Sequence, residues 1–293
     1  PPPFFFSTPT PPTEMLRSLV GSEMCIRDRL LPHEGNGSLF LKNVPYPDRV
    51  VPGKPNKKNS YAQLGMIDYA VQNCLQKKYS ALVTLPISKE ILSTQTKKFT
   101  GHTEYIANLA NNKNQEVMLL AHKNLRVALV TTHIALSDIP KHISKEKLKK
   151  VLTTLDRDLK DKFKIKNPRI TMLGLNPHAG EGGKIGTEDA EILLPAAKKL
   201  RKIGIDISFP VSADTAFTGD LLKKTDAYLA MYHDQALPVL KALSFGKAIN
   251  ITLGVPIIRT SVDHGVALDV AGKDESNFSS LLEAFKAAKK LIK

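Results

Sequence analysis

The chain has 293 residues, of which 42% are hydrophobic and 24% charged, so it is long enough for one large or two modest α/β domains. No apolar run approaches the about 18 residues of a membrane span. The net charge of +14 comes mostly from lysines interleaved with Asp and Glu, which favours a solvated surface and argues against a nucleic-acid partner. The only cysteines, Cys25 and Cys74, lack metal-ligand spacing and fit a reducing, cytoplasmic compartment.

The first 29 residues differ from the rest of the chain. They are rich in proline, show neither helical nor strand periodicity, and lack the pattern of a secretory signal. The stretch "EMCIRDR" reads back into DNA as GAG ATG TGT ATA AGA GAC AGN, which resembles a transposon end used in sequencing libraries. We therefore expect residues 1–29 to be an assembly artefact or a disordered tail, and the folded protein to begin near Leu30.

From residue 60 onwards, helical and strand patterns alternate. Helices are predicted for "SYAQLGMIDYAVQNCLQKK", with Ser60 as N-cap, and then for "GHTEYIANLA", residues 144–163, "TEDAEILLPAAKKLRKIG", "QALPVLKAL" and "SNFSSLLEAFKAAKKLIK". Strands are predicted for "SALVTLP", the possible hairpin "EVMLLAH" and "RVALVTTH", "RITMLGLNPH", "IDISFPV", "DAYLAMYH" and "AINITLG". This alternation predicts an α/β fold with a largely parallel sheet and helices on both faces.

Three histidines follow apolar strands in the same way. "RVALVTTH" ends on His133, "RITMLGLNPH" on His178 and "AYLAMYH" on His233. Ligand sites of open α/β sheets form beyond the carboxyl ends of the strands. Any one of these histidines alone is better explained as a structural residue, but three neutral imidazoles that converge would suit a catalytic divalent metal.

Other candidate groups lie around these histidines. "GHTE" places His102 and Thr103 where a loop enters a helix, which suits either a bound phosphate or a simple helix cap. Either Asp214 or Asp234 could orient a metal-bound histidine, or cap a helix. The cations and the amide that could bind substrate oxygens are Lys241, Asn250 and Arg259, of which Arg259 can do so in bidentate fashion.

Six motifs in order resemble one family: "GHTEYIA", "TTHIAL", "LNPHAGEGG", "SADTAF", "AMYHDQALPVLK" and "NITLGVPIIRTSVDHGVALDVAG". From about residue 30 to the C-terminus, the chain resembles the 4-hydroxythreonine-4-phosphate dehydrogenase family of vitamin B6 synthesis. The resemblance implies two α/β/α domains like those of isocitrate and isopropylmalate dehydrogenases. It also implies a homodimer with active sites at the subunit interface. The expected domains are residues 30–103 with 270–293, and residues 104–269.

The resemblance also implies site residues and a reaction. The positions matching the metal ligands are His133, His178 and His233, and those matching the substrate-binding residues are His102, Thr103, Lys241, Asn250 and Arg259. The family oxidises 4-phosphooxy-L-threonine with NAD or NADP and a divalent metal, which is Zn, Mg or Co. The product is a β-keto acid that loses CO2. For the general base, His102, Lys241 and a water held by Asp234 stay open.

One departure from the family leaves alternatives open. The family's first strand and its glycine-rich loop of the type GDPAGIGPE are missing here, with the suspected artefact in their place. The alternatives are a paralogue acting on 4-phospho-D-threonate or 4-phospho-D-erythronate, a phosphate acyltransferase that needs no metal, and an inactive truncated remnant that only dimerises.

Overall fold

The structure is a computed structural model that describes residues 44–89, 91–92, 99, 101–113, 115–273 and 277–292. The expected artefact or tail at residues 1–29 lies outside the described residues. The chain divides into two compact units: one holds the described residues before Gln115 and after Gly254, and the other spans Gln115–Gly254. Helices and strands alternate in both units, which confirms the α/β class.

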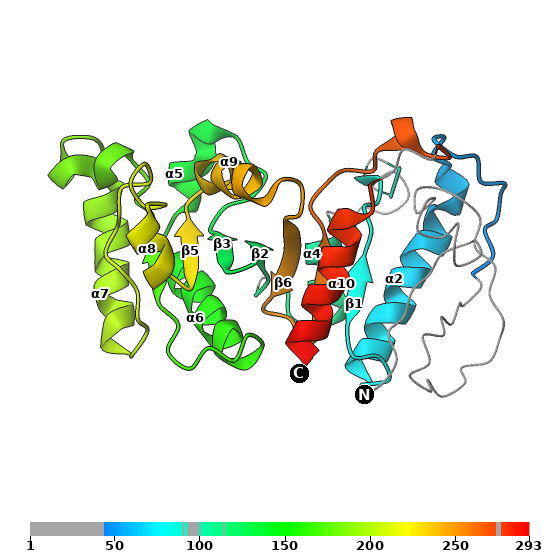
Figure 1. Ribbon diagram of the computed structural model, residues 1–293, viewed down its shortest axis with the longest axis horizontal. Helices are drawn as coiled ribbons and strands as arrows, with labels where there is room; N and C mark the ends of the chain where they lie inside the picture. The colour runs from blue at the N-terminus through cyan, green and yellow to red at the C-terminus, as the bar shows by residue number, and fades with distance from the viewer. Residues whose placement is uncertain are drawn as a thin grey trace. The chain divides into compact units, whose positions relative to one another are not determined.

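The first unit packs helices around a short parallel strand pair. Its elements are α2 (Ser60–Leu75), β1 (Leu82–Thr84), α4 (His102–Leu109), β7 (Arg259–Val262) and α10 (Ser279–Ile292). Strands β1 and β7 pair in parallel, and α10 packs along both of them. Figure 1 shows α10 beside β1. The buried Thr260 hydroxyl donates to the Ala284 carbonyl at 2.9 Å, which joins β7 to α10. The apolar side chains of α2, α4 and β1 form the core of this unit with Val255 and Ile257.

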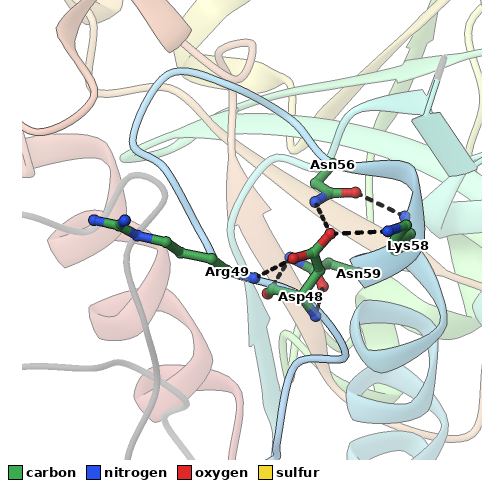
Figure 2. Close-up of polar contacts among 5 residues, drawn as sticks. All are labelled: Asp48, Arg49, Asn56, Lys58 and Asn59. Carbon is green, nitrogen blue, oxygen red and sulfur yellow. Dashed lines mark hydrogen bonds and ion pairs between the residues drawn. The ribbon is translucent and has the colours of Figure 1, made fainter.

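A polar cluster fixes the start of α2, and the predicted N-cap was wrong by one position. Asn59 is the N-cap residue and Ser60 is the first residue of the helix. Figure 2 shows the Asp48 carboxylate accepting from the Asn56 side chain at 3.2 Å, with the Lys58 ammonium 3.3 Å away. The Asn59 side chain accepts from the Asp48 N–H and donates to its carbonyl, both at 3.0 Å. This cluster anchors the incoming chain to the first turn of α2.

The second unit contains a mixed sheet. Its strands are β2 (Val117–His122), β3 (Leu125–Leu129), β4 (Ile170–Met172), β5 (Ala227–Ala230) and β6 (Ile249–Leu253). Their order is β6-β2-β3-β5-β4. The predicted hairpin is confirmed, because β2 and β3 are antiparallel. The sheet is less parallel than expected, because β2 is also antiparallel to β6, whereas β3, β5 and β4 run parallel.

Both faces of this sheet are buried. The helices of the unit are α5 (Ile139–His142), α6 (Lys145–Asp161), α7 (Leu194–Lys202), α8 (Gly219–Lys224) and α9 (His233–Ser244). Leu120, Val127 and Leu129 belong to the apolar cluster that includes residues of α9. Leu119 and Ala128 alternate with them, so they point to the opposite face, and both are fully buried. The expectation of a covered sheet therefore holds for these strands.

The strand predicted for "IDISFPV" was wrong. This segment makes only isolated bridges, at Ile207 to Ile170 and at Val211 to Leu173. Between the bridges, the Met172 N–H donates to the Ser208 hydroxyl at 2.9 Å in place of a backbone carbonyl. Pro210 supplies no N–H, and the Val211 N–H donates to the Met172 carbonyl at 2.9 Å instead, so the register shifts by one residue between the two bridges.

Among the described residues, no helix is long and apolar enough to cross a membrane.

Candidate functional site

All three strand-end histidines lie in the second unit, beyond the carboxyl ends of neighbouring parallel strands. His133 follows β3 and His178 follows β4, while His233 comes after β5 as the first residue of α9. Since β3, β5 and β4 are adjacent, the three segments leave the same edge of the sheet.

Two of the three imidazoles are close together. The ring centroids of His133 and His233 are 5.7 Å apart, so the two rings are direct neighbours. In the part of the chain that the structure describes, no group of three or more His, Cys, Asp or Glu side chains has the spacing of a metal site. The structure therefore brings His133 and His233 together, whereas His178 does not complete a three-ligand group with them among the described residues.

The loop that carries His178 has an unusual backbone. Residues 178–182 all have positive φ, from 42° to 76°, although three of them are not glycine. Each non-glycine residue in this region costs about 1–2 kcal/mol. Just before these residues, the buried Asp189 carboxylate accepts from the N–H groups of Leu175 at 2.8 Å and Asn176 at 3.0 Å. Asp189 therefore anchors the start of the loop, and local backbone bonds such as that of the Ile185 N–H to the Gly180 carbonyl (3.1 Å) follow within it.

Two carboxylates lie beside the histidine segments. Asp234 is exposed, and its Oδ1 is 3.4 Å from Nδ1 of His233. Asp214 is also exposed and accepts a hydrogen bond from the Ser212 hydroxyl. This bond and the nearby His178 lower the pKa of Asp214 below its usual value. Asp234 is thus in direct reach of a candidate ligand, while Asp214 is electrostatically linked to the His178 loop.

The remaining predicted residues of this unit occupy different elements. Lys241 is on the exposed side of α9, and Asn250 is on β6, opposite Leu120 of β2. The Asn250 Oδ1 atom is buried, and no hydrogen-bond partner for it occurs among the described residues. A buried amide oxygen without a partner is costly, which is the usual mark of a group that binds a ligand or water.

In the first unit, the structure brings Arg259 close to the start of α4. Arg259 is 3% exposed, and its Nη2 donates to the Thr84 hydroxyl at 2.7 Å. Burial lowers the pKa of Arg259 to about 10, against the opposing effect of Glu104, so the guanidinium stays protonated at neutral pH. A buried cation held in this way is a strong binding group for an anion.

His102 and Thr103 are the first two residues of α4, after Gly101 as N-cap. Thr103 is therefore not the helix cap, and its side chain is buried. Burial, together with nearby Arg259 and Lys89, lowers the pKa of His102 to about 3, so the imidazole is neutral at pH 7. Lys89 was missed by the sequence reasoning, since one lysine in "SKE" carries no signal without the fold.

The sequence and structure are similar to known proteins over most of the chain. The family model described as "Pyridoxal phosphate biosynthetic protein PdxA" matches residues 25–288. The chain is 47% identical over 252 residues to a 4-hydroxythreonine-4-phosphate dehydrogenase of Pseudomonas putida, covering 86% of this chain and 76% of that one. The crystal structure of a protein of the same name from Klebsiella pneumoniae has a TM-score of 0.81 at 31% identity, covering 90% of this chain and 83% of that one.

Proposed function

The chain belongs to the PdxA family of pyridoxal phosphate biosynthetic proteins, and we propose that it is the oxidoreductase of vitamin B6 synthesis that oxidises 4-phosphooxy-L-threonine. The product is 2-amino-3-oxo-4-phosphooxybutanoate, which decarboxylates to 3-amino-2-oxopropyl phosphate. The hydride acceptor is NAD or NADP, and the nicotinamide supplies the redox chemistry while the protein positions the substrate.

The observation that carries the proposal is the buried Arg259 guanidinium beside the first turn of α4. A phosphorylated substrate presents a dianion that needs such a fixed cation, together with the free N–H groups of a helix start. We assign phosphate binding to Arg259, His102 and Thr103. Because His102 is neutral at pH 7, it contributes hydrogen bonds rather than charge. Lys241 and Asn250 are assigned to the remaining oxygens of the substrate.

We assign the divalent metal, which is Zn, Mg or Co, to His133, His178 and His233. When bound, such an ion lowers the pKa of a coordinated hydroxyl and stabilises negative charge that develops on its oxygen. The adjacency of the His133 and His233 rings supports this assignment, as does the suitability of imidazole nitrogens as ligands for such an ion.

Removal of the hydroxyl proton needs a group that accepts a proton readily, and His102 is a poor candidate for this role. A pKa of about 3 leaves His102 weakly basic at pH 7. We therefore favour Lys241, or a water held by Asp234, as the proton acceptor. Asp234 lies beside the His233 ring and can hold a water close to the reacting hydroxyl.

The proposal includes a cytoplasmic homodimer with active sites at the subunit interface, as the family resemblance implies. Its test is a comparison of kcat/KM for 4-phosphooxy-L-threonine, 4-phospho-D-threonate and 4-phospho-D-erythronate, with each nicotinamide cofactor and each metal. We expect 4-phosphooxy-L-threonine to have the highest value. A preference for either hydroxy acid would assign the chain to the paralogous reaction, and turnover that persists in a chelator would contradict the metal site.

A further inference from the structure

Beyond the histidines themselves, the structure contains a side chain that links their three segments. Gln235 lies in the first turn of α9, and its amide folds back towards the sheet. Its Oε1 accepts from the Met231 N–H at 2.7 Å, and its Nε2 donates to the Gly174 carbonyl. Met231 precedes His233 on one segment, and Gly174 precedes His178 on the other.

The Gln235 side-chain amide takes the place of a backbone hydrogen-bond pair between the segments that follow β4 and β5. The backbone ladder between β4 and β5 ends where the Leu173 N–H donates to the Leu229 carbonyl at 2.9 Å. The Met231 N–H, which would form the next rung, donates to Gln235 instead, and the Leu175 N–H donates to the Asp189 carboxylate. A primary amide carries one acceptor and a donor, as a peptide group does. The Gln235 side chain therefore continues the pairing by one step after the strands have separated.

The same linkage continues to the His133 segment. The Met231 carbonyl accepts from the Thr131 N–H at 3.1 Å and from the buried Thr131 hydroxyl at 2.7 Å. Thr131, Met231, Gln235 and Gly174 thus form one chain of hydrogen bonds across the three segments. After Gly174, the N–H groups of Leu175 and Asn176 donate to the Asp189 carboxylate. The backbone from Gly174 to the start of the His178 loop is therefore held in place by hydrogen bonds.

We infer that Gln235 is a positioning residue that sets the place of the His178 loop relative to the His133 and His233 pair, and that it thereby determines the affinity for the divalent metal. This inference rests on the proposed function, because it takes the three histidines as the ligands. Residues that orient metal ligands typically change metal affinity by about 10- to 100-fold when they are replaced.

Two substitutions separate this role from a purely structural one. Gln235→Glu keeps the acceptor for the Met231 N–H but places a carboxylate oxygen against the Gly174 carbonyl, and Gln235→Leu removes both bonds. The matched control is Thr225→Val, which breaks the buried hydroxyl pair of Thr171 and Thr225 (2.7 Å) between the same two segments. Thr171 is the middle residue of β4 and Thr225 precedes β5, so the pair lies before the carboxyl ends of the strands, which the histidines follow.

The experiment is a calorimetric titration of each metal-free full-length protein with Zn²⁺, together with its thermal unfolding without metal. We expect Gln235→Glu and Gln235→Leu to raise the Kd by about 10- to 100-fold, and Thr225→Val to lower the Tm while leaving the Kd unchanged. The inference about Gln235, but not the proposed metal site, would be overturned if the Kd for Zn²⁺ were unchanged in both Gln235 variants. It would also be overturned if the Kd rose equally in Thr225→Val. A wild-type protein that binds no Zn²⁺ would overturn the proposed metal site, and the inference with it.

Discussion

Replacing Arg259 by lysine tests the proposed phosphate site while keeping its charge. Arg259 is almost completely buried, and one of its nitrogens is already engaged with Thr84. Lysine retains one positive charge but loses the planar fork that can bind two oxygens at once. The change therefore removes hydrogen bonds to the substrate without removing the cation.

The magnitude follows from the hydrogen bonds lost. A hydrogen bond to a charged group contributes about 1.5–3 kcal/mol, so losing one to the phosphate corresponds to a rise in KM of about 10- to 100-fold. The phosphate does not change during the reaction, so the binding is lost equally from the ground and transition states, and kcat should stay near the wild-type value.

The assay is steady-state formation of NADH or NADPH, with Thr84→Val as the control. That variant loses the contact between Thr84 and Arg259 but keeps the guanidinium. We expect it to lower stability by about 1–3 kcal/mol, with a much smaller change in KM than in Arg259→Lys. A KM for Arg259→Lys that equals the wild-type value would refute the assignment of Arg259 to the substrate.

Three other substitutions test separate parts of the account. His233→Ala should abolish stoichiometric metal binding and turnover while the thermal unfolding of the metal-free protein stays cooperative; a full metal content measured by atomic absorption would contradict this. Burial, Arg259 and Lys89 lower the pKa of His102 from 6.5 to about 3. Between these two pH values, His102 is protonated in the unfolded state but not in the folded state. Stability should therefore fall by up to about 1.4 kcal/mol per pH unit as the pH drops from 6.5 towards 3, and urea unfolding of His102→Asn should lack this contribution. Gly254→Ala should destabilise the fold by more than about 3 kcal/mol, because Gly254 has φ +77° and a Cβ would lie 1.9 Å from the Gln115 carbonyl oxygen; an unchanged Tm would show that this backbone can shift.

Much of the architecture could be predicted from hydrophobic periodicity. The helix at Ser60–Leu75 and the hairpin of β2 and β3 follow directly from their apolar spacing. The failures came where side chains replaced backbone partners. The position of Asn59 at the start of the helix depends on its hydrogen bonds with Asp48, which lies outside the apolar repeat of the helix. The Ser208 hydroxyl takes a backbone hydrogen bond in the segment that was expected to be a strand.

The places of the candidate residues at strand ends could be predicted from the sequence, but the contacts that support them could not. Strand-end positions of histidines can be read from a sequence, because the carboxyl ends of neighbouring parallel strands share one edge. The pKa of His102 cannot be, since it depends on burial and on Arg259, which is distant in sequence. The same holds for Gln235, which reads as an ordinary helix residue until its contact with Gly174 is seen.

The central claim is tested most directly by mixing the metal-loaded protein with 4-phosphooxy-L-threonine and NAD or NADP, and measuring the reduced cofactor and CO2 released over the same time course. The account predicts equal amounts of both products, formation that stops when a chelator is added, and none in His233→Ala. A folded, metal-loaded protein that forms no reduced cofactor with this substrate would contradict it.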